Sequence, residues 1–111
     1  MDIEKNIIVG PTDTDSYNII HHPVYFIWTE QAILQWLLNT YKSLDLNTYK
    51  IEKIQSKFIT PGKLYDELIL YLHPKIRNER IQFQGRIINV ETKKLLVEIN
   101  FWVRIEGRTN E

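Results

Sequence analysis

A long segment free of proline and glycine, residues 25–41, limits the possible folds more than any other part of the chain. Polar residues form one narrow stripe of a helix here, and almost all the other positions are apolar. Three of these polar residues recur at every fourth position: Gln31, Gln35 and Asn39. Pro23 suits the first turn of a helix, where its missing N–H is not needed. We therefore expect a helix over 23–41 that is buried on most of its sides.

The remaining apolar patterns predict strands. A short run at 7–9 precedes a break at Gly10-Pro11 and predicts the first strand. Four later segments carry strand patterns: 49–60, 66–73, 81–87 and 95–105. In the first of these the apolar positions slip by one place, which predicts a β-bulge near Lys53.

The order of these elements predicts the fold class. We expect connections at Pro61-Gly62, over 73–78 and at 91–93, so that the four later strands follow one another as a meander. One long helix with strands in series favours an antiparallel sheet curled around that helix. The sequence therefore predicts a single α+β domain over 1–111.

Composition limits the class of function. Acidic and basic residues number 14 each in 111 residues, so no positive field favours nucleic acid or an anionic membrane. There is no cysteine, which excludes disulfides, thiol nucleophiles and zinc-thiolate sites. The first ten residues do not resemble a signal peptide, and no run reaches the roughly 18 apolar residues of a membrane span. We expect a cytoplasmic protein, and we expect an oligomer because so short a chain covers its apolar surface poorly.

The segment between the first strand and the helix, DTDSYNIIHHPVYF, holds the chemically interesting residues. Taken alone, Asp13-Thr14-Asp15 fits a turn that caps a helix, a metal site with His21 and His22, or the acidic part of a catalytic site. Adjacent ligands in a loop lack the fixed i, i+4 spacing of a helical metal site, so we expect no metal. The residues themselves leave the choice between cap and catalysis open.

In its strand–loop–helix context this motif resembles that of the hotdog-fold thioesterases, in the branch of 4-hydroxybenzoyl-CoA thioesterase and the YbgC-like acyl-CoA thioesterases. The matched positions are two acidic residues, an aliphatic pair, an aromatic or histidine pair, the tyrosine that opens the helix and a later acidic residue: Asp13, Asp15, Ile19-Ile20, His21-His22, Tyr25 and Glu30. The segment FITPGKLYDEL at 58–68 is similar to a second family pattern, a strand end followed by proline and aspartate. The resemblance covers nearly the whole chain.

The resemblance implies a thioester hydrolase for acyl-CoA or acyl-carrier-protein substrates, with no cofactor, because coenzyme A is part of the substrate. It implies that Asp15 attacks the thioester carbonyl or activates a water molecule. It also implies that the peptide N–H of His22, at the positive end of the helix, polarises the carbonyl, with the His22 side chain implicated as well. Asp13 is expected to brace the loop. The expected substrate-binding residues are Asn18, Ile19, Tyr25 and Glu30, of which Glu30 also fits a structural role.

Three positions depart from the family pattern: Pro11, Asn18 and Val24. Asn18 stands where glycine is usual, and asparagine tolerates the left-handed backbone conformation better than most residues. Pro11 and Val24 replace an aromatic and a small polar residue near the expected pocket.

The family's cross-subunit sites imply a homodimer or homotetramer. Two other functions remain open: a catalytically idle hotdog module that binds an acyl ligand or partner, and a relative with dehydration or condensation-linked chemistry.

Overall fold

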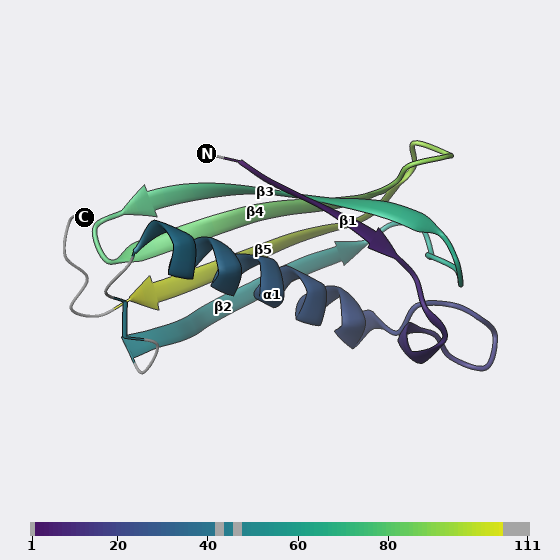
Figure 1. Ribbon diagram of the computed structural model, residues 1–111, viewed down its shortest axis with the longest axis horizontal. Helices are drawn as coiled ribbons and strands as arrows, with labels where there is room; N and C mark the ends of the chain where they lie inside the picture. Colours follow the sequence, from purple (N-terminus) through teal and green to yellow (C-terminus); the bar gives the residue numbers. More distant parts are fainter. Residues whose placement is uncertain (1, 42–43, 46–47, 106–111) are drawn as a thin grey trace.

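A computed structural model describes residues 2–41, 44–45 and 48–105 of the chain. One helix, α1 (His22–Thr40), lies across one face of a five-stranded antiparallel sheet (Figure 1). The strands in chain order are β1 (Ile3–Ile8), β2 (Tyr49–Phe58), β3 (Glu67–Arg77), β4 (Arg80–Asn89) and β5 (Leu95–Ile105). A short 3-10 turn, Pro11–Asp13, lies between β1 and α1. The predicted α+β class is confirmed, and α1 agrees with the predicted helix to within one residue at each end.

The order of the strands in the sheet is β1-β3-β4-β5-β2, so the predicted meander is wrong for β2. β3, β4 and β5 follow one another as hairpins, but β2 pairs with β5 at the far edge of the sheet. The connection 59–66 therefore crosses the start of β5, where the N–H groups of Ile59 and Thr60 donate to the carbonyl oxygen of Leu96 at 2.8 and 3.2 Å. An alternating pattern gives the faces of a strand but not its neighbours, which is why the sequence did not show this crossing.

β3 runs to Arg77 and does not end at His73, so the predicted connection over 73–78 is wrong. β1 pairs only with residues 67–72 of β3, and beyond them β3 has a neighbour on one side only. Pro74 fits there because a proline without an N–H is tolerated where the strand edge is open. β1 itself begins at Ile3, before the predicted 7–9, because its residues 4–6 are exposed and give no apolar pattern.

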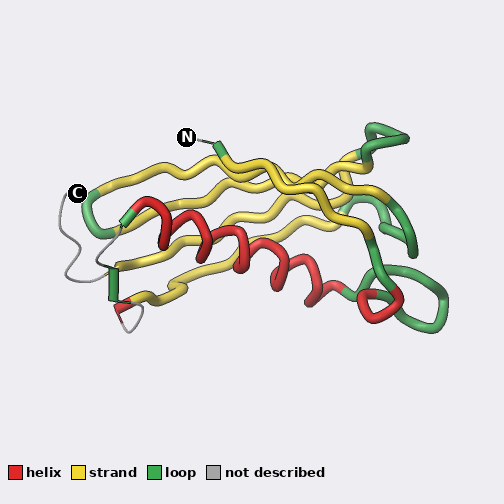
Figure 2. The backbone as a smooth tube through the Cα atoms, viewed as in Figure 1, coloured by secondary structure: helices red, strands yellow, loops and turns green. Residues whose placement is uncertain are grey.

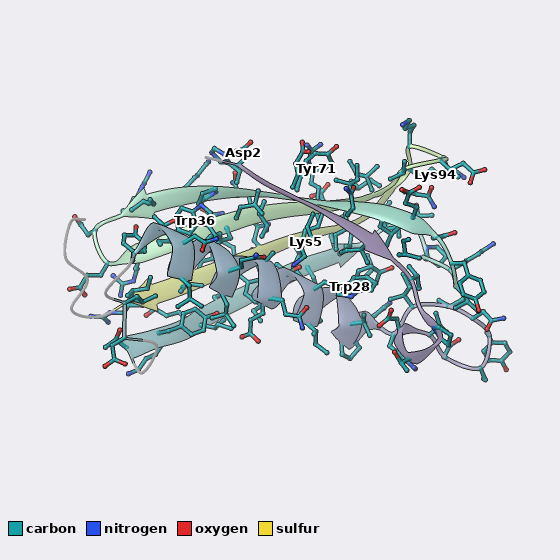
Figure 3. The ribbon with its side chains drawn as sticks, in the orientation of Figure 1. Asp2, Lys5, Trp28, Trp36, Tyr71 and Lys94 are labelled. Atoms are coloured by element: carbon teal, nitrogen blue, oxygen red, sulfur yellow. The ribbon has the colours of Figure 1, made fainter. Side chains whose placement is uncertain are left out.

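Within one chain, α1 is covered on one side only. Its buried residues form a single stripe: Tyr25, Thr29, Ala32, Ile33 and Leu37. Trp36 packs edge-on against Phe83 of β4, with ring centroids 5.5 Å apart (Figure 3). Ile27 and Leu38, however, remain 52% and 49% exposed. The expected burial on most sides is therefore not reached within one chain, because five strands cover one side of the helix. In the described part of the chain no helix is long and apolar enough to cross a membrane.

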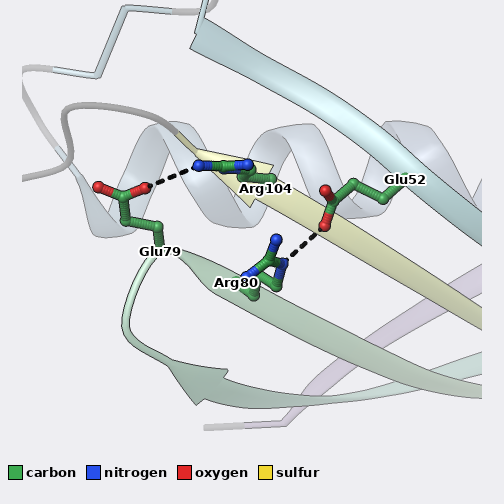
Figure 4. A network of polar contacts seen from close by, with 4 residues as sticks. All are labelled: Glu52, Glu79, Arg80 and Arg104. Atoms are coloured by element: carbon green, nitrogen blue, oxygen red, sulfur yellow. Dashed lines mark hydrogen bonds and ion pairs between the residues drawn. The ribbon is translucent and has the colours of Figure 1, made fainter.

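The two ends of the sheet differ in character. At the end where α1 finishes, Arg80 Nε lies 2.9 Å from Glu52 Oε1 and Arg104 Nη2 lies 3.6 Å from Glu79 Oε2 (Figure 4). Glu52 sits in the predicted bulge of β2, which the register shift between Ile51 and Lys53 confirms. At the other end, the loop before α1 and the connection from β2 to β3 lie together (Figure 2).

Candidate functional site

Asp13 braces the loop in front of α1 from both ends. Its carboxylate Oδ2 accepts the N–H of Gly10 at 2.9 Å. Its carbonyl oxygen accepts the N–H of His21 at 3.0 Å. The predicted bracing role of Asp13 is confirmed, and the loop is closed at its base.

Asp15 also takes part in the loop, which agrees with the turn that was one of the open interpretations of Asp13-Thr14-Asp15. Its carboxylate Oδ1 accepts the N–H groups of Tyr17 at 2.8 Å and of Ile19 at 3.1 Å. Within the described part of the chain no hydrogen bond is made by Oδ2, so this oxygen keeps its lone pairs for a substrate or a water molecule. The half-buried carboxylate can brace the loop through one oxygen and act chemically through the other.

Asn18 stands in the left-handed region with φ 61°, as expected for a residue in a usual glycine position. Its carbonyl oxygen accepts the N–H of Leu64 at 2.9 Å. Two residues after Asn18, the N–H of Ile20 donates to the carbonyl oxygen of Gly62 at 2.9 Å. The left-handed turn thus fixes the loop against the connection between β2 and β3.

In the described part of the chain, one peptide N–H at the start of α1, that of His22, has no hydrogen-bond partner. His21 is extended and precedes the helix, His22 is its first residue, and Pro23 falls in the first turn. The N–H of Val24 donates to the carbonyl oxygen of His21 at 3.0 Å. The first N–H groups of a helix have no partner within it, and the His22 N–H is one of these. It lies at the positive end of the helix dipole, where developing negative charge is stabilised.

A cavity of about 150 Å³ opens beside the start of α1. Its lining residues come from the loop, the helix and the β2–β3 connection: Ile19, Ile20, His22, Tyr25, Phe58, Ile59, Thr60 and Pro61. The sequence predicted Ile19, His22 and Tyr25 here and missed the rest. The segment FITP, residues 58–61, opens the second family pattern, in which it is a strand end followed by proline, but that resemblance assigned these residues no place in the site.

No protein-family model and no curated protein matches the sequence. Solved structures do match. A 1,4-dihydroxy-2-naphthoyl-CoA thioesterase from Synechocystis aligns with a TM-score of 0.81 and 17% identity, over 94% of this chain and 81% of that chain. An aspartate-to-asparagine variant of 4-hydroxybenzoyl-CoA thioesterase in complex with 4-hydroxybenzoyl-CoA aligns with a TM-score of 0.79 and 13% identity, over 94% and 83%. A Streptococcus mutans protein bound to acetyl-CoA aligns with a TM-score of 0.79 and 14% identity, over 98% and 84%.

The chain has the hotdog fold. In this hotdog domain, three of the predicted site residues lie outside the cavity lining: Asp15, Asn18 and Glu30. Asp15 and Asn18 belong to the adjoining loop. Glu30 lies further along α1. The pKa of the Tyr49 phenol is raised mainly by the burial of that phenol and further by the charge of Glu30.

Tyr25 lines the cavity of the hotdog domain and is only 2% exposed. Burial raises the pKa of its phenol, a hydrogen bond with the Gly62 backbone opposes that shift, and the nearby charge of Asp66 adds to it. The phenol therefore stays neutral at physiological pH and joins the helix to the β2–β3 connection.

The chemistry available at this site is that of carboxylate, imidazole and peptide N–H groups. Among the described residues, no group of three or more histidine, aspartate or glutamate side chains is placed to hold a metal ion. His22, the first residue of α1, lines an apolar cavity, and the Asp15 loop is fixed beside it. Such a site can bind an apolar acyl group and polarise the carbonyl attached to it.

Proposed function

We propose that this hotdog domain hydrolyses acyl thioesters of coenzyme A or of an acyl carrier protein, releasing a carboxylic acid and a thiol. One observation carries the proposal: His22 lines an apolar cavity next to the loop that holds Asp15, and its N–H at the start of α1 has no hydrogen-bond partner among the described residues. The thioesterase names of the similar structures, and the coenzyme A thioesters bound in two of them, support it.

In the proposed reaction the acyl group enters the cavity and its carbonyl oxygen accepts the N–H of His22. Oδ2 of Asp15 either attacks the carbonyl carbon, to form an anhydride that water then hydrolyses, or removes a proton from an attacking water. Negative charge builds on the carbonyl oxygen and is stabilised by the His22 N–H and the helix dipole. In the first route the carbon–sulfur bond breaks as the anhydride forms, before water hydrolyses it, and in the second it breaks after water has added. The thiolate leaves with a proton from solvent or from the His22 imidazole. Coenzyme A takes part as a portion of the substrate, and no further cofactor is proposed.

We propose that the active form is a homodimer or homotetramer. β2 is an edge strand of the sheet, and it leaves a ten-residue backbone edge open on its outer side. Exposed apolar side chains continue from this strand onto its connection and the helix: Ile27, Ile54 and Ile59. Sedimentation at micromolar concentration measures the assembly, and a monomer there contradicts this part of the proposal. The assignment to the 4-hydroxybenzoyl-CoA and YbgC-like branch, and the cytoplasmic location, stay predictions.

One observation favours a second function, an idle module that binds an acyl ligand. Asp15 braces its own loop through Oδ1 and does not line the cavity. Both features are those of an aspartate with a purely structural role. A hydrolase and a binding module differ in whether thiol is released.

The deciding experiment measures free thiol from a panel of acyl-CoA thioesters of rising chain length and of aryl-CoA thioesters, beside binding of the same compounds by calorimetry. Thiol release that is lost in Asp15→Asn supports the hydrolase. Binding without release supports the idle module.

A further inference from the structure

Two rings from distant parts of the sequence stack at the mouth of the cavity. The imidazole of His22 and the phenyl ring of Phe58 lie with centroids 3.7 Å apart and planes 6° from parallel. His22 is the first residue of α1, and Phe58 is the last residue of β2. The pairing of β2 with β5 at the edge of the sheet places the end of β2 beside the start of α1 and so brings the two rings together.

The ring of Phe58 is itself held from other sides. It meets Phe26 edge-on, with centroids 6.2 Å apart and an interplanar angle of 86°, and it meets Tyr25 at 5.8 Å and 50°. Aromatic contacts of these geometries are favourable and directional, so they restrict how the ring can turn. Phe58 is therefore a fixed surface, although 38% of it remains exposed.

His22 has little else to hold its ring. Its side chain is exposed, and in the described part of the chain the imidazole makes no hydrogen bond. An exposed histidine normally samples several staggered side-chain rotamers. The flat contact with Phe58 favours one of them, which keeps the imidazole at the mouth of the cavity.

We infer that Phe58 is a positioning residue: its ring orients the His22 imidazole for hydrolysis of the thioester bound in the cavity. This inference rests on the proposed thioester hydrolysis. Phe58 itself exchanges no proton and forms no bond. Its effect is on the turnover number, because small misplacements of a reacting group slow the chemical step more than they weaken binding.

The experiment compares Phe58→Leu, which removes the flat ring, with Phe58→Tyr, which keeps it. Tyr65→Leu is the matched control, because Tyr65 is a 70%-exposed aromatic residue of the connection that follows Phe58 and makes no ring contact with His22. Turnover number and KM are measured by thiol release from acetyl-CoA and benzoyl-CoA. The ring protons of His22, one of three histidines, are followed by NMR and assigned with His22→Gln. Sedimentation shows that all variants keep the same assembly.

In the wild type and in Phe58→Tyr we expect the His22 ring protons to be shifted upfield by the neighbouring ring current. In Phe58→Leu that shift disappears, the turnover number falls about tenfold or more for both substrates, and KM stays within about twofold. Tyr65→Leu keeps both the ring-current shift and the turnover number. If Phe58→Leu does not fold, Phe58→Met is measured instead with the same two readouts.

Three results overturn the inference in different ways. A lost ring-current shift with an unchanged turnover number shows that the orientation of His22 does not matter, and the hydrolase proposal then stands. A raised KM with an unchanged turnover number makes Phe58 a wall of the acyl cavity only, and the hydrolase proposal again stands. Absence of thiol release by the wild type from every thioester removes the hydrolase proposal and the positioning role together, whatever the NMR shows.

Discussion

A Cβ atom at Gly62 would overlap Cδ1 of Ile20, closer than real Cβ contacts occur. The same atom would also lie 2.7 Å from Cδ2 of Leu96 and 2.9 Å from the hydroxyl of Tyr25. Gly62 is therefore the point where the β2–β3 connection, the loop and the helix come into contact.

The first prediction is that Gly62→Ala destabilises the fold. Adding a methyl group to a tightly packed site forces neighbours to move, which typically costs about 1–3 kcal/mol. Gly10→Ala is the control, because a Cβ there meets nothing nearer than Asp13 Oδ2 at 3.6 Å. Urea unfolding of both variants measures the difference. Equal stability of the two would show that the connection can shift away from the helix.

The second prediction concerns Tyr49, whose buried hydroxyl has no hydrogen-bond partner among the described residues. Burial, and then the charge of Glu30, raise the pKa of this phenol from its usual 10.0. The unfolded chain therefore loses the phenolic proton at lower pH than the folded chain does, so unfolding releases a proton above pH 10.0 and stability falls as pH rises. Tyr49→Phe should weaken this alkaline loss.

At neutral pH the same variant should be as stable as the wild type or more stable by up to about 1 kcal/mol, since it removes an unsatisfied buried hydroxyl. Thermal unfolding of both proteins at pH 7 and above pH 10 measures both effects. An alkaline loss as steep in Tyr49→Phe as in the wild type would assign it to another group, such as Tyr25.

The helix and the loop were predictable because their signals are local. The apolar run of 25–41 defines α1, and Asn18 in a glycine position predicts the left-handed turn that is observed. The bracing role of Asp13 in the loop and the bulge of β2 near Lys53 also follow from short segments. Each of these depends on residues that are neighbours in the chain.

The missing part of the site depends on topology. Phe58 belongs to the cavity only because β2 pairs with β5, which places the end of β2 beside His22. Nothing in the alternating pattern of β2 selects β5 over β3 as its partner. The sequence allows Asp15 a place in a turn, but its partners there, the N–H groups of Tyr17 and Ile19, depend on the exact turn geometry.

The third prediction concerns the size of the acyl cavity. Ile59 lines it and is 45% exposed, so Ile59→Ala should enlarge it with little loss of stability. Tyr25 is unsuited to this test because it is 2% exposed, and truncating so large a buried side chain typically costs about 3–5 kcal/mol. A cavity of about 150 Å³ holds a group of about the size of benzene.

Ile59→Ala should therefore shift the preference among acyl-CoA thioesters toward longer or bulkier acyl groups. The measurement is kcat/KM by thiol release across the panel, with Ile76→Ala as the control because Ile76 is similarly exposed at 48% but lies at the other end of β3. An unchanged preference profile would place the acyl group elsewhere.

The last prediction tests the two functions of Asp15 against each other. In Asp15→Asn the side-chain oxygen can still accept the N–H groups of Tyr17 and Ile19, so the loop keeps its shape. The negative charge and the free carboxylate oxygen are lost, and with them the nucleophile or base. The turnover number should fall by at least about a hundredfold, the lower end of what a positioned acid or base contributes, while KM changes little.

Asp13→Asn is the control, since it changes the neighbouring brace, which bonds Gly10, without touching the proposed reacting group. A folded, substrate-binding and inactive Asp15→Asn beside an active Asp13→Asn assigns catalysis to Asp15. Normal hydrolysis by Asp15→Asn, whatever its melting temperature, would leave Asp15 as a loop brace only and would end the proposed mechanism.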